Sequence, residues 1–483
     1  MSESLKRQAV KGVAWSAVER FSIQGVQFVL SIILARLVAP AEYGLIAMLG
    51  IFLAIAQAFI DSGFSSALIQ KKDRTETDYS TVFYFNIVVA GIVYVVLFIG
   101  SPYIAGFYKE PQLEIITKWV GLNIVLSAFS MVQRAKLTIK LNFKTQTKAS
   151  LLSVIVSGCI GIMLAYQGFG VWALVIQALS SNLLNTLLLW VFAKWRPSWI
   201  FSWVSFKTLF SFGSKLLLSG LLHTVYINLY SLVIGRKYSA TDVGYYNRAY
   251  QFAAFPSTNI VGIVGRAIYP VQCQLQDDEE RLNATFIQYL RMICYVVFPL
   301  MIGLAVLAKP LIVLLLTEKW LPAAELLPIL CLAYMWYPIM VINNQMLNVR
   351  GRSDYFLKAE IVKKAAAIGI LVVTLPWGLK VLCWGLVAYN WVDIVIIIYY
   401  TKKVIRTGYI RQIKDITPFF LLSVGMGGIM LLSIMCINNT ILKLLGGIVA
   451  GISSYFMLSF IFRIREFVSI IHFTKINLLK NYA

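Results

Sequence analysis

Residues 80–106 read STVFYFNIVVAGIVYVVLFIGSPYIAG, an apolar run without a single charged side chain. A helix needs about 20 such residues to cross the ~30 Å hydrocarbon core of a bilayer. The whole chain has the same character, because 59% of its 483 residues are hydrophobic and only 13% are charged. Globular proteins average about 25% charged residues. The sequence therefore predicts an all-α polytopic membrane protein.

Apolar runs separated by polar breaks predict about fourteen transmembrane helices. The first run follows three basic residues and resembles a signal peptide. It is interpreted as a span because it lacks a small-residue cleavage site and contains Glu19 and Arg20. The expected spans are 12–37, 43–69, 80–106, 116–134, 148–166, 170–193, 208–234, 244–270, 285–308, 323–349, 357–376, 381–401, 416–436 and 441–462.

The basic residues fix the expected orientation. Most of the 43 Lys and Arg residues lie in the N-terminus, the even-numbered loops and the C-terminus. Basic residues in short loops stay in the cytoplasm, so both termini are predicted to be cytoplasmic. The odd-numbered loops contain only Arg36, Lys109, Arg236, Lys237, Lys319, Lys380 and Lys443.

A repeat at a spacing of 200 residues divides the spans. Residues 36–44 (RLVAPAEYG) and 236–244 (RKYSATDVG) each join the first and second helix of a six-helix set. Six helices separate the copies, which indicates a parallel repeat about an axis along the membrane normal, as in alternating-access transporters. The alternative is a chance match between turn-forming residues. The matched positions are Arg36 and Arg236, Glu42 and Asp242, and Gly44 and Gly244.

This repeat predicts three regions. They are an N-terminal lobe of six spans (1–195), a C-terminal lobe of six spans (208–402), and two additional helices with a cytoplasmic tail (403–483). The matched corners lie on the predicted outer side. Arg36, Glu42, Arg236 and Asp242 are therefore candidates for a gate, or they cap the helix turns.

Polar side chains at helical spacing follow one face of the first, seventh and eighth spans. With polar residues of the second span, they predict a wet cavity between the lobes, with a basic character to which Arg291 also contributes. Arginine suits phosphate because its planar fork donates two hydrogen bonds at once. The candidate substrate-binding residues are Arg20, Gln24, Gln27, Asp61, Lys215, His223, Arg248, Gln251, Asn259 and Arg266.

Each of these residues also has a structural interpretation. Arg20 can pair with its neighbour Glu19, Arg36 and Arg291 can reach the membrane interface, His223 can be a packing residue, and Asp61 can cap a helix. A charge at the bilayer centre costs at least ~2.5–3.5 kcal/mol on insertion scales. Stripes on several helices together favour the cavity.

No catalytic, metal or cofactor site is predicted. The six cysteines are scattered and only two histidines accompany them. There is no phosphate-binding Gly-rich loop and no nucleophile with a base at useful spacing. Nucleic acid is not an expected partner, because the basic loops are short and dispersed along one membrane face.

Three stretches carry a family resemblance: 11–15 (KGVAW), 34–44 (LARLVAPAEYG) and 61–70 (DSGFSSALIQ). They resemble the opening of the polysaccharide transporter family. These are the Wzx-type lipid-linked oligosaccharide flippases of the multidrug/oligosaccharidyl-lipid/polysaccharide superfamily, which also holds MATE exporters and MurJ-type lipid flippases.

The resemblance implies a bacterial inner-membrane location and a polyprenyl-diphosphate-linked oligosaccharide as substrate, such as an O-antigen, capsule or exopolysaccharide repeat unit. It implies membrane lipids and other glycan-assembly proteins as partners. It carries no motif that fixes a substrate-binding residue.

Two other functions remain open. One is a MATE-like exporter of small cations with Glu19 or Asp61 as coupling carboxylate, which the excess of basic over acidic residues inside the spans disfavours. The other is a membrane enzyme of glycan assembly, which the short odd-numbered loops disfavour. The sequence therefore predicts a flippase rather than an enzyme.

Overall fold

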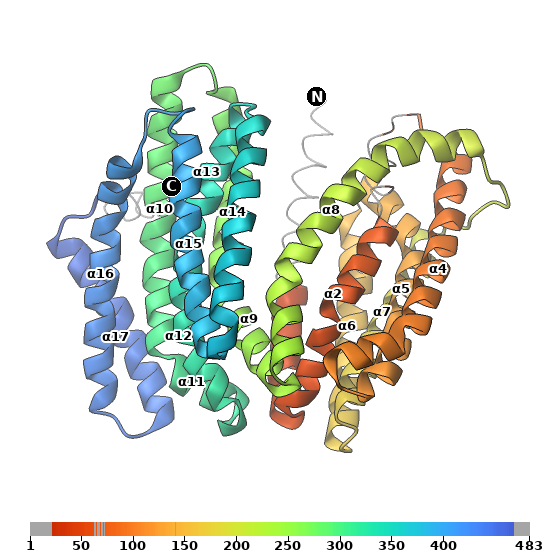
Figure 1. The fold of residues 1–483 in the computed structure, drawn as a ribbon, viewed down its shortest axis with the longest axis horizontal. Coiled ribbons are helices and arrows are strands. Elements are labelled where there is room, and N and C mark those ends of the chain that lie inside the picture. Colours follow the sequence, from red (N-terminus) through yellow and green to blue (C-terminus); the bar gives the residue numbers. More distant parts are fainter. Residues whose placement is uncertain are drawn as a thin grey trace, which may run out of the picture. The chain divides into compact units, whose positions relative to one another are not determined.

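The computed structural model describes residues 22–61, 64, 68, 71, 73–140 and 142–467, without the side chains of 61, 208, 211–216, 218–220, 222, 223 and 226. Every regular element in these ranges is a helix, and the helices form two compact units that divide at Gly244 (Figure 1). The first unit contains Ser22–Leu37, α2 (Pro40–Asp61), α4 (Glu76–Tyr108), α5 (Gln112–Ile139), α6 (Phe143–Tyr166), α7 (Val171–Ala193), α8 (Trp203–Lys237) and the first turn of α9 (Ala240–Gln274).

The second unit contains the rest of α9 and the helices that follow it. They are α10 (Glu279–Val306), α11 (Ala308–Leu316), η1 (Glu318–Trp320), α12 (Leu321–Met335), α13 (Tyr337–Val349), α14 (Ser353–Thr374), η2 (Leu375–Trp377), α15 (Leu379–Thr401), α16 (Tyr409–Met435) and α17 (Thr440–Ile461).

Ten helical segments in the described ranges are long and apolar enough to cross a membrane, with η1, α12 and α13 counted together as Glu318–Val349. The protein is therefore a multi-pass membrane protein. Within the described residues, each predicted span after the first coincides with helical structure, and the span predicted at 116–134 lies in the long helix α5. The helices α9 and α14 are not among the ten, and both carry several charged residues within their length. A total of fourteen spans stays a prediction.

The predicted span 323–349 is interrupted. α12 ends at Met335 and α13 begins at Tyr337, with Trp336 between them. Pro338 explains the break, because it has no N–H to donate to the preceding turn and its ring crowds the carbonyl four residues earlier. Residues 309–322, expected between two spans, form most of α11 and η1 instead.

In the first unit, the segment after α7 is fixed to the start of α4. Glu76 accepts a hydrogen bond of 2.6 Å from the Trp195 indole and lies 2.7 Å from the Lys136 ammonium. Lys136 also lies over the Trp195 ring, 5.0 Å from its centre. The Ser198 amide donates to the Ser80 hydroxyl at 2.9 Å. The linker predicted from residues 194–199 is thus tied to the beginning of α4 before the chain enters α8.

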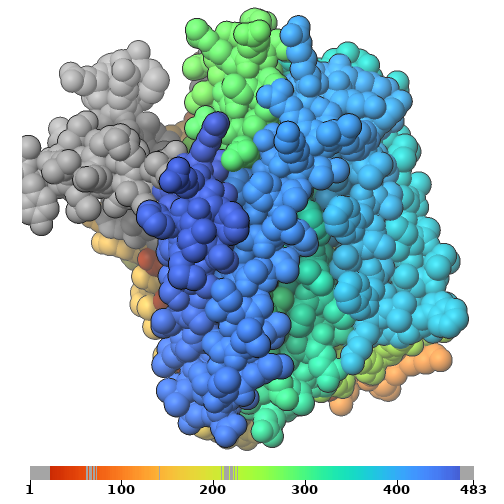
Figure 2. All heavy atoms as spheres, turned by 90° about the vertical axis from the view of Figure 1, so that its left-hand side faces the viewer, coloured from red at the N-terminus to blue at the C-terminus, as the bar shows by residue number. Residues whose placement is uncertain are grey.

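In the second unit, α16 and α17 pack beside α10. The hydroxyl of Tyr455 on α17 donates to the carbonyl of Tyr295 on α10 at 2.7 Å, and the Tyr295 hydroxyl lies 3.1 Å from Ser459 Oγ. In Figure 2 the blue segments, which come last in the described chain, are turned toward the viewer, with green and teal atoms of earlier helices of this unit visible beside and between them.

The division at Gly244 differs from the predicted lobes, which separate at 195–208. The first unit includes α8 because α8 packs against α2 and α4. The repeat groups helices by symmetry and the units group them by contact, so the predicted lobes stay a proposal.

Candidate functional site

The predicted cavity residues of the first unit are described only in part. On the helix Ser22–Leu37, Gln24 is half-buried and Gln27 is exposed, while Ser31 donates to the Phe28 carbonyl at 2.8 Å. Arg20 lies outside the described residues, and so do the side chains of Asp61, Lys215 and His223. Their roles stay predictions.

The α9 stripe is described completely, and its two arginines differ. Arg248 is 6% exposed; its guanidinium lies over the Trp320 ring at 5.3 Å, and Nη1 donates to Gln251 Oε1 at 3.3 Å. Such a cation–π contact holds the guanidinium at a fixed place. Arg266 is exposed, and Asn259 donates to the Phe255 carbonyl at 2.9 Å.

Arg248 and Arg266 cannot bind the same phosphate group. They are 18 residues apart on one helix, which corresponds to about 27 Å at 1.5 Å per residue. A diphosphate spans only a small part of that distance. The two arginines are therefore separate positions along the helix, one near each end, and not one anion site.

Aromatic side chains lie around the N-terminal part of this stripe. Tyr246 and Tyr250 stack at 6.1 Å, Tyr250 contacts Tyr334 of α12 at 5.5 Å, and Tyr334 contacts Tyr337 at 6.3 Å. The sequence analysis did not single out this cluster, because its members come from three different helices. It joins the part of α9 that carries Arg248 to α12 and α13.

The candidate gate residues Glu42 and Asp242 both cap helices. Glu42 Oε2 accepts from the Ala39 amide at 2.9 Å, before α2. Asp242 Oδ2 accepts from the Ser239 amide at 3.2 Å and from its hydroxyl at 2.7 Å, before α9. These side chains satisfy amides at helix N-termini. Both carboxylates therefore cap helix N-termini, and a role in a gate stays a prediction.

Both candidate gate arginines are exposed. The Arg236 guanidinium lies over the Phe107 ring at 5.2 Å. The closest approach between the two corners is made by backbone. A Cβ on Gly44 would overlap the Ala240 carbonyl, and a Cβ on Gly244 would overlap the Pro40 carbonyl. Glycine at both positions allows the first turns of α2 and α9 to touch.

Arg291, expected to add to the basic character of the cavity, is engaged elsewhere. Its Nε lies 2.6 Å from Glu466 Oε1, and its Nη1 lies 3.1 Å from Asp415 Oδ1. The guanidinium also lies over the Phe419 ring at 5.2 Å. Sequence spacing did not predict these two carboxylates, because they come from segments more than a hundred residues away. A contribution of Arg291 to the cavity stays a prediction.

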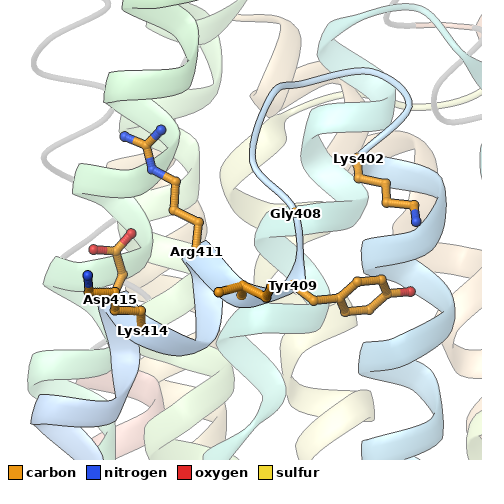
Figure 3. A pocket seen from close by; sticks show the side chains of 7 residues that line it. Lys402, Gly408, Tyr409, Arg411, Lys414 and Asp415 are labelled. Carbon is orange, nitrogen blue, oxygen red and sulfur yellow. The ribbon is translucent and has the colours of Figure 1, made fainter.

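A basic pocket lies at the loop between α15 and α16, with a volume of about 720 Å³ (Figure 3). Figure 3 shows Lys402 and Tyr409 on one side of it and Arg411 and Lys414 on the other. Lys414 also lines an adjoining apolar groove of about 860 Å³ formed by α16 and α17. A cationic pocket that continues into an apolar groove matches a lipid with a phosphate head group.

A buried charged cluster lies in the second unit and was missed by the sequence analysis. Lys363 of α14, 3% exposed, lies 2.6 Å from Glu360 Oε1 and 3.4 Å from Oδ1 of Asp393 on α15. The sequence contained one signal of this cluster, a pair of opposite charges in two consecutive predicted spans. Lys363 lies at about the same distance from the start of α14 as Asp393 lies from the end of α15.

Comparisons with known proteins agree with a transporter. A family model described as "Polysaccharide biosynthesis protein" matches residues 33–325. The chain is 26% identical over 427 residues to the teichuronic acid biosynthesis protein TuaB of Bacillus subtilis, with 88% of each chain covered. It is 26% identical to the lipopolysaccharide biosynthesis protein WzxC of Escherichia coli, covering 77% of this chain and 76% of that one. The succinoglycan biosynthesis transport protein ExoT of Rhizobium meliloti is also 26% identical, with coverages of 68% and 66%.

Two solved structures share the fold. The lipid II flippase MurJ in an inward closed conformation superposes with a TM-score of 0.72 at 15% identity, covering 93% of this chain and 98% of that one. An inward-facing multidrug resistance MATE transporter of the MOP superfamily gives 0.61 at 17% identity, with coverages of 80% and 98%. The family model spans more than half of the chain. The protein therefore belongs to the polysaccharide biosynthesis protein family and has the fold of the MOP superfamily.

Proposed function

We propose that the protein is a flippase that moves a polyprenyl-diphosphate-linked oligosaccharide from the cytoplasmic to the outer leaflet. The single observation that carries this proposal is the basic pocket that shares Lys414 with an apolar groove. Lys402, Arg411 and Lys414 supply cations for a diphosphate, and the groove between α16 and α17 supplies an apolar surface for a prenyl chain. The names of the relatives TuaB, WzxC and ExoT support a glycan as the cargo.

The path of the diphosphate then runs along α9. Arg266 lies near the end of α9 that the positive-inside rule assigns to the cytoplasm, and Arg248 lies about 27 Å farther out. The substrate meets Arg266 first and Arg248 later, with Arg20 and Lys215 as further candidate contacts. In this scheme both termini are cytoplasmic, and the membrane is the bacterial inner membrane.

The outer gate of this flippase is the backbone contact between the first turns of α2 and α9. The close backbone approach at Gly44 and Gly244 closes this gate, while Glu42 and Asp242 cap the N-termini of α2 and α9. Transport by alternating access requires this contact to separate as the two six-helix lobes, 1–195 and 208–402, rock against each other. The helices of 403–483 carry the lipid-facing site.

The chain acts as a carrier in this scheme and catalyses no covalent step. A MATE-like exporter would have the same fold, so the fold does not separate the two functions. The basic stripe on α9 separates the two functions, because Arg248 and Arg266 repel a cationic drug and attract a phosphate.

The test is a reconstituted assay with a fluorescent polyprenyl-diphosphate oligosaccharide in vesicles that contain the purified protein. A membrane-impermeant quencher should reach the probe in the inner leaflet only after transport. We expect quenching to proceed to completion with the protein and to stop near half without it. Equal quenching with and without the protein, together with efflux of an organic cation, would contradict the flippase function and favour an exporter.

A further inference from the structure

A chain of four charged side chains runs through α14 and ends on α15. Lys364, one third exposed, lies 3.6 Å from Glu360, which lies 2.6 Å from Lys363. Lys363 in turn lies 3.4 Å from Asp393, and Lys363 and Asp393 are 3% and 6% exposed. The inner end of this chain is thus a carboxylate held away from solvent.

Asp393 is held less firmly than the other carboxylate of the cluster. Its Oδ2 accepts from the Tyr389 hydroxyl at 3.2 Å, but its Oδ1 accepts no hydrogen bond although Lys363 is close. A buried carboxylate oxygen without a hydrogen bond is costly, and protonation removes the charge that makes it so. Glu360 has a shorter contact with the same ammonium, so Lys363 stays paired when Asp393 is neutral.

The other helices around α15 place no competing charge on Asp393. The groups that act on it electrostatically are Lys363 and Glu360 from α14 and Tyr389 from α15 itself. From α12, the Ala333 carbonyl accepts from Asn390 at 2.8 Å. Among the other ionisable groups of α12, α13 and α16, Glu325 pairs with Lys380, Asp415 pairs with Arg291, Tyr334 contacts Tyr250, and Tyr337 contacts Tyr334. Cys331 is buried in α12, Arg411 and Lys414 line the pocket at the loop between α15 and α16, and the Tyr409 hydroxyl donates to the Val395 carbonyl of α15.

We propose that Asp393 is a proton-binding site, and that its protonation releases Lys363 and loosens the contact of α14 with α15. The proton comes from a hydronium ion of the solvent: one O–H bond of the hydronium breaks, one O–H bond forms on Oδ1 of Asp393, and a water molecule is left. A proton fits better than a metal cation, because the Lys363 ammonium already lies 3.4 Å from this oxygen and would repel a second cation. Asp393 lies eight residues from the end of α15, which corresponds to about 12 Å along the helix. A proton reaches Asp393 from that end by way of the partly exposed Glu360, which contacts Lys363.

This site gives the carrier a means of coupling to a proton gradient. The Lys363–Asp393 ion pair joins two neighbouring helices, whereas the Lys363–Glu360 pair lies within α14. Protonation therefore removes the ion pair between the two helices and leaves the one inside α14. The coupling to transport rests on the proposed flippase function, but proton binding itself does not.

The experiment is a pH titration of the full-length protein in nanodiscs, followed by infrared difference spectroscopy. Between about pH 9 and about pH 6 ordinary carboxylates stay ionised, so the carbonyl band of a protonated acid reports an unusual site. We expect this band in the wild type and in the control E325Q, and its loss in D393N. In K363M the band should appear at least one pH unit higher, because the paired cation is gone.

Retention of the band in D393N, or its absence from the wild type, would overturn the proposal. A band that responds to replacing sodium by choline, and not to pH, would assign the site to a metal cation instead. A second measurement uses spin labels on α14 and α15, whose separation should change with pH in the wild type and stay constant in D393N. If proton binding is observed but no glycan is transported, the site stands and the flippase function fails.

Discussion

Gly44 and Gly244 are 200 residues apart and make the same contact in reverse: each lies against the carbonyl of the first residue of the other's helix, Ala240 for Gly44 and Pro40 for Gly244. Pro40 and Ala240 are themselves 200 residues apart. The Gly244 Cβ position also lies 3.3 Å from the Gly44 amide nitrogen. Backbone meets backbone here, which only glycine permits at this distance.

A side chain at this crossing should force it open. We expect Gly44→Val to separate the first turns of α2 and α9, because its Cβ overlaps the Ala240 carbonyl. In an Ala240→Cys background, the thiol should be protected from a membrane-impermeant maleimide and become reactive when Gly44→Val is added. Gly91→Val is the matched control, since nothing lies within 4 Å of that position. Unchanged labelling would mean that this crossing is not a gate.

The two arginines of α9 should act at different steps. Each contributes a charge-assisted contact of about 1.5–3 kcal/mol, so we expect R248Q and R266Q together to slow translocation at least tenfold. R266Q alone should raise the substrate concentration for half-maximal transport, and R248Q alone should lower the maximal rate. R352Q is the control, because Arg352 pairs with Asp354 on the exposed surface. Normal transport by the double variant, at equal membrane level, would remove α9 from the substrate path.

Arg291 should be a stability residue. In R291M, Asp415 and Glu466 lose their shared cation while they remain mostly buried, at 21% and 14% exposure. Breaking this partly buried network should cost less stability than breaking a fully buried ion pair. We expect the free energy of unfolding to fall by about 1–3 kcal/mol. The measurement is the thermal unfolding midpoint in detergent, compared with K380M, which breaks an exposed pair with Glu325. An equal midpoint in both variants would show that the network contributes nothing.

The basic pocket should bind anionic lipid. Replacing Lys402, Arg411 and Lys414 by glutamine should weaken the binding of a polyprenyl diphosphate and reduce the salt dependence of binding, since fewer cations face the phosphates. Native mass spectrometry of the detergent-solubilised protein gives the bound fraction. Lys443→Gln, a substitution in the first turn of α17, should leave the bound fraction unchanged. Equal loss in that control would indicate a general effect of charge.

The positions of the spans were predictable because hydropathy is a property of one helix at a time. From α2 to α17, helical structure coincides with each predicted run. The break at Trp336 followed from Pro338, which the apolar composition of 323–349 concealed. The family resemblance was equally local, since short stretches within residues 11–70 carried it.

Which charges meet was decided by the tertiary structure alone. Sequence spacing put Arg248 and Arg266 on one face, but the ring of Trp320 fixes one of them and about 27 Å of helix separates it from the other. Arg291 finds its partners on α16 and beyond α17, and Lys363 finds Asp393 across the hairpin of α14 and α15. A helix can rotate about its axis without changing its hydropathy, so the packing of neighbouring helices determines which polar residues come together.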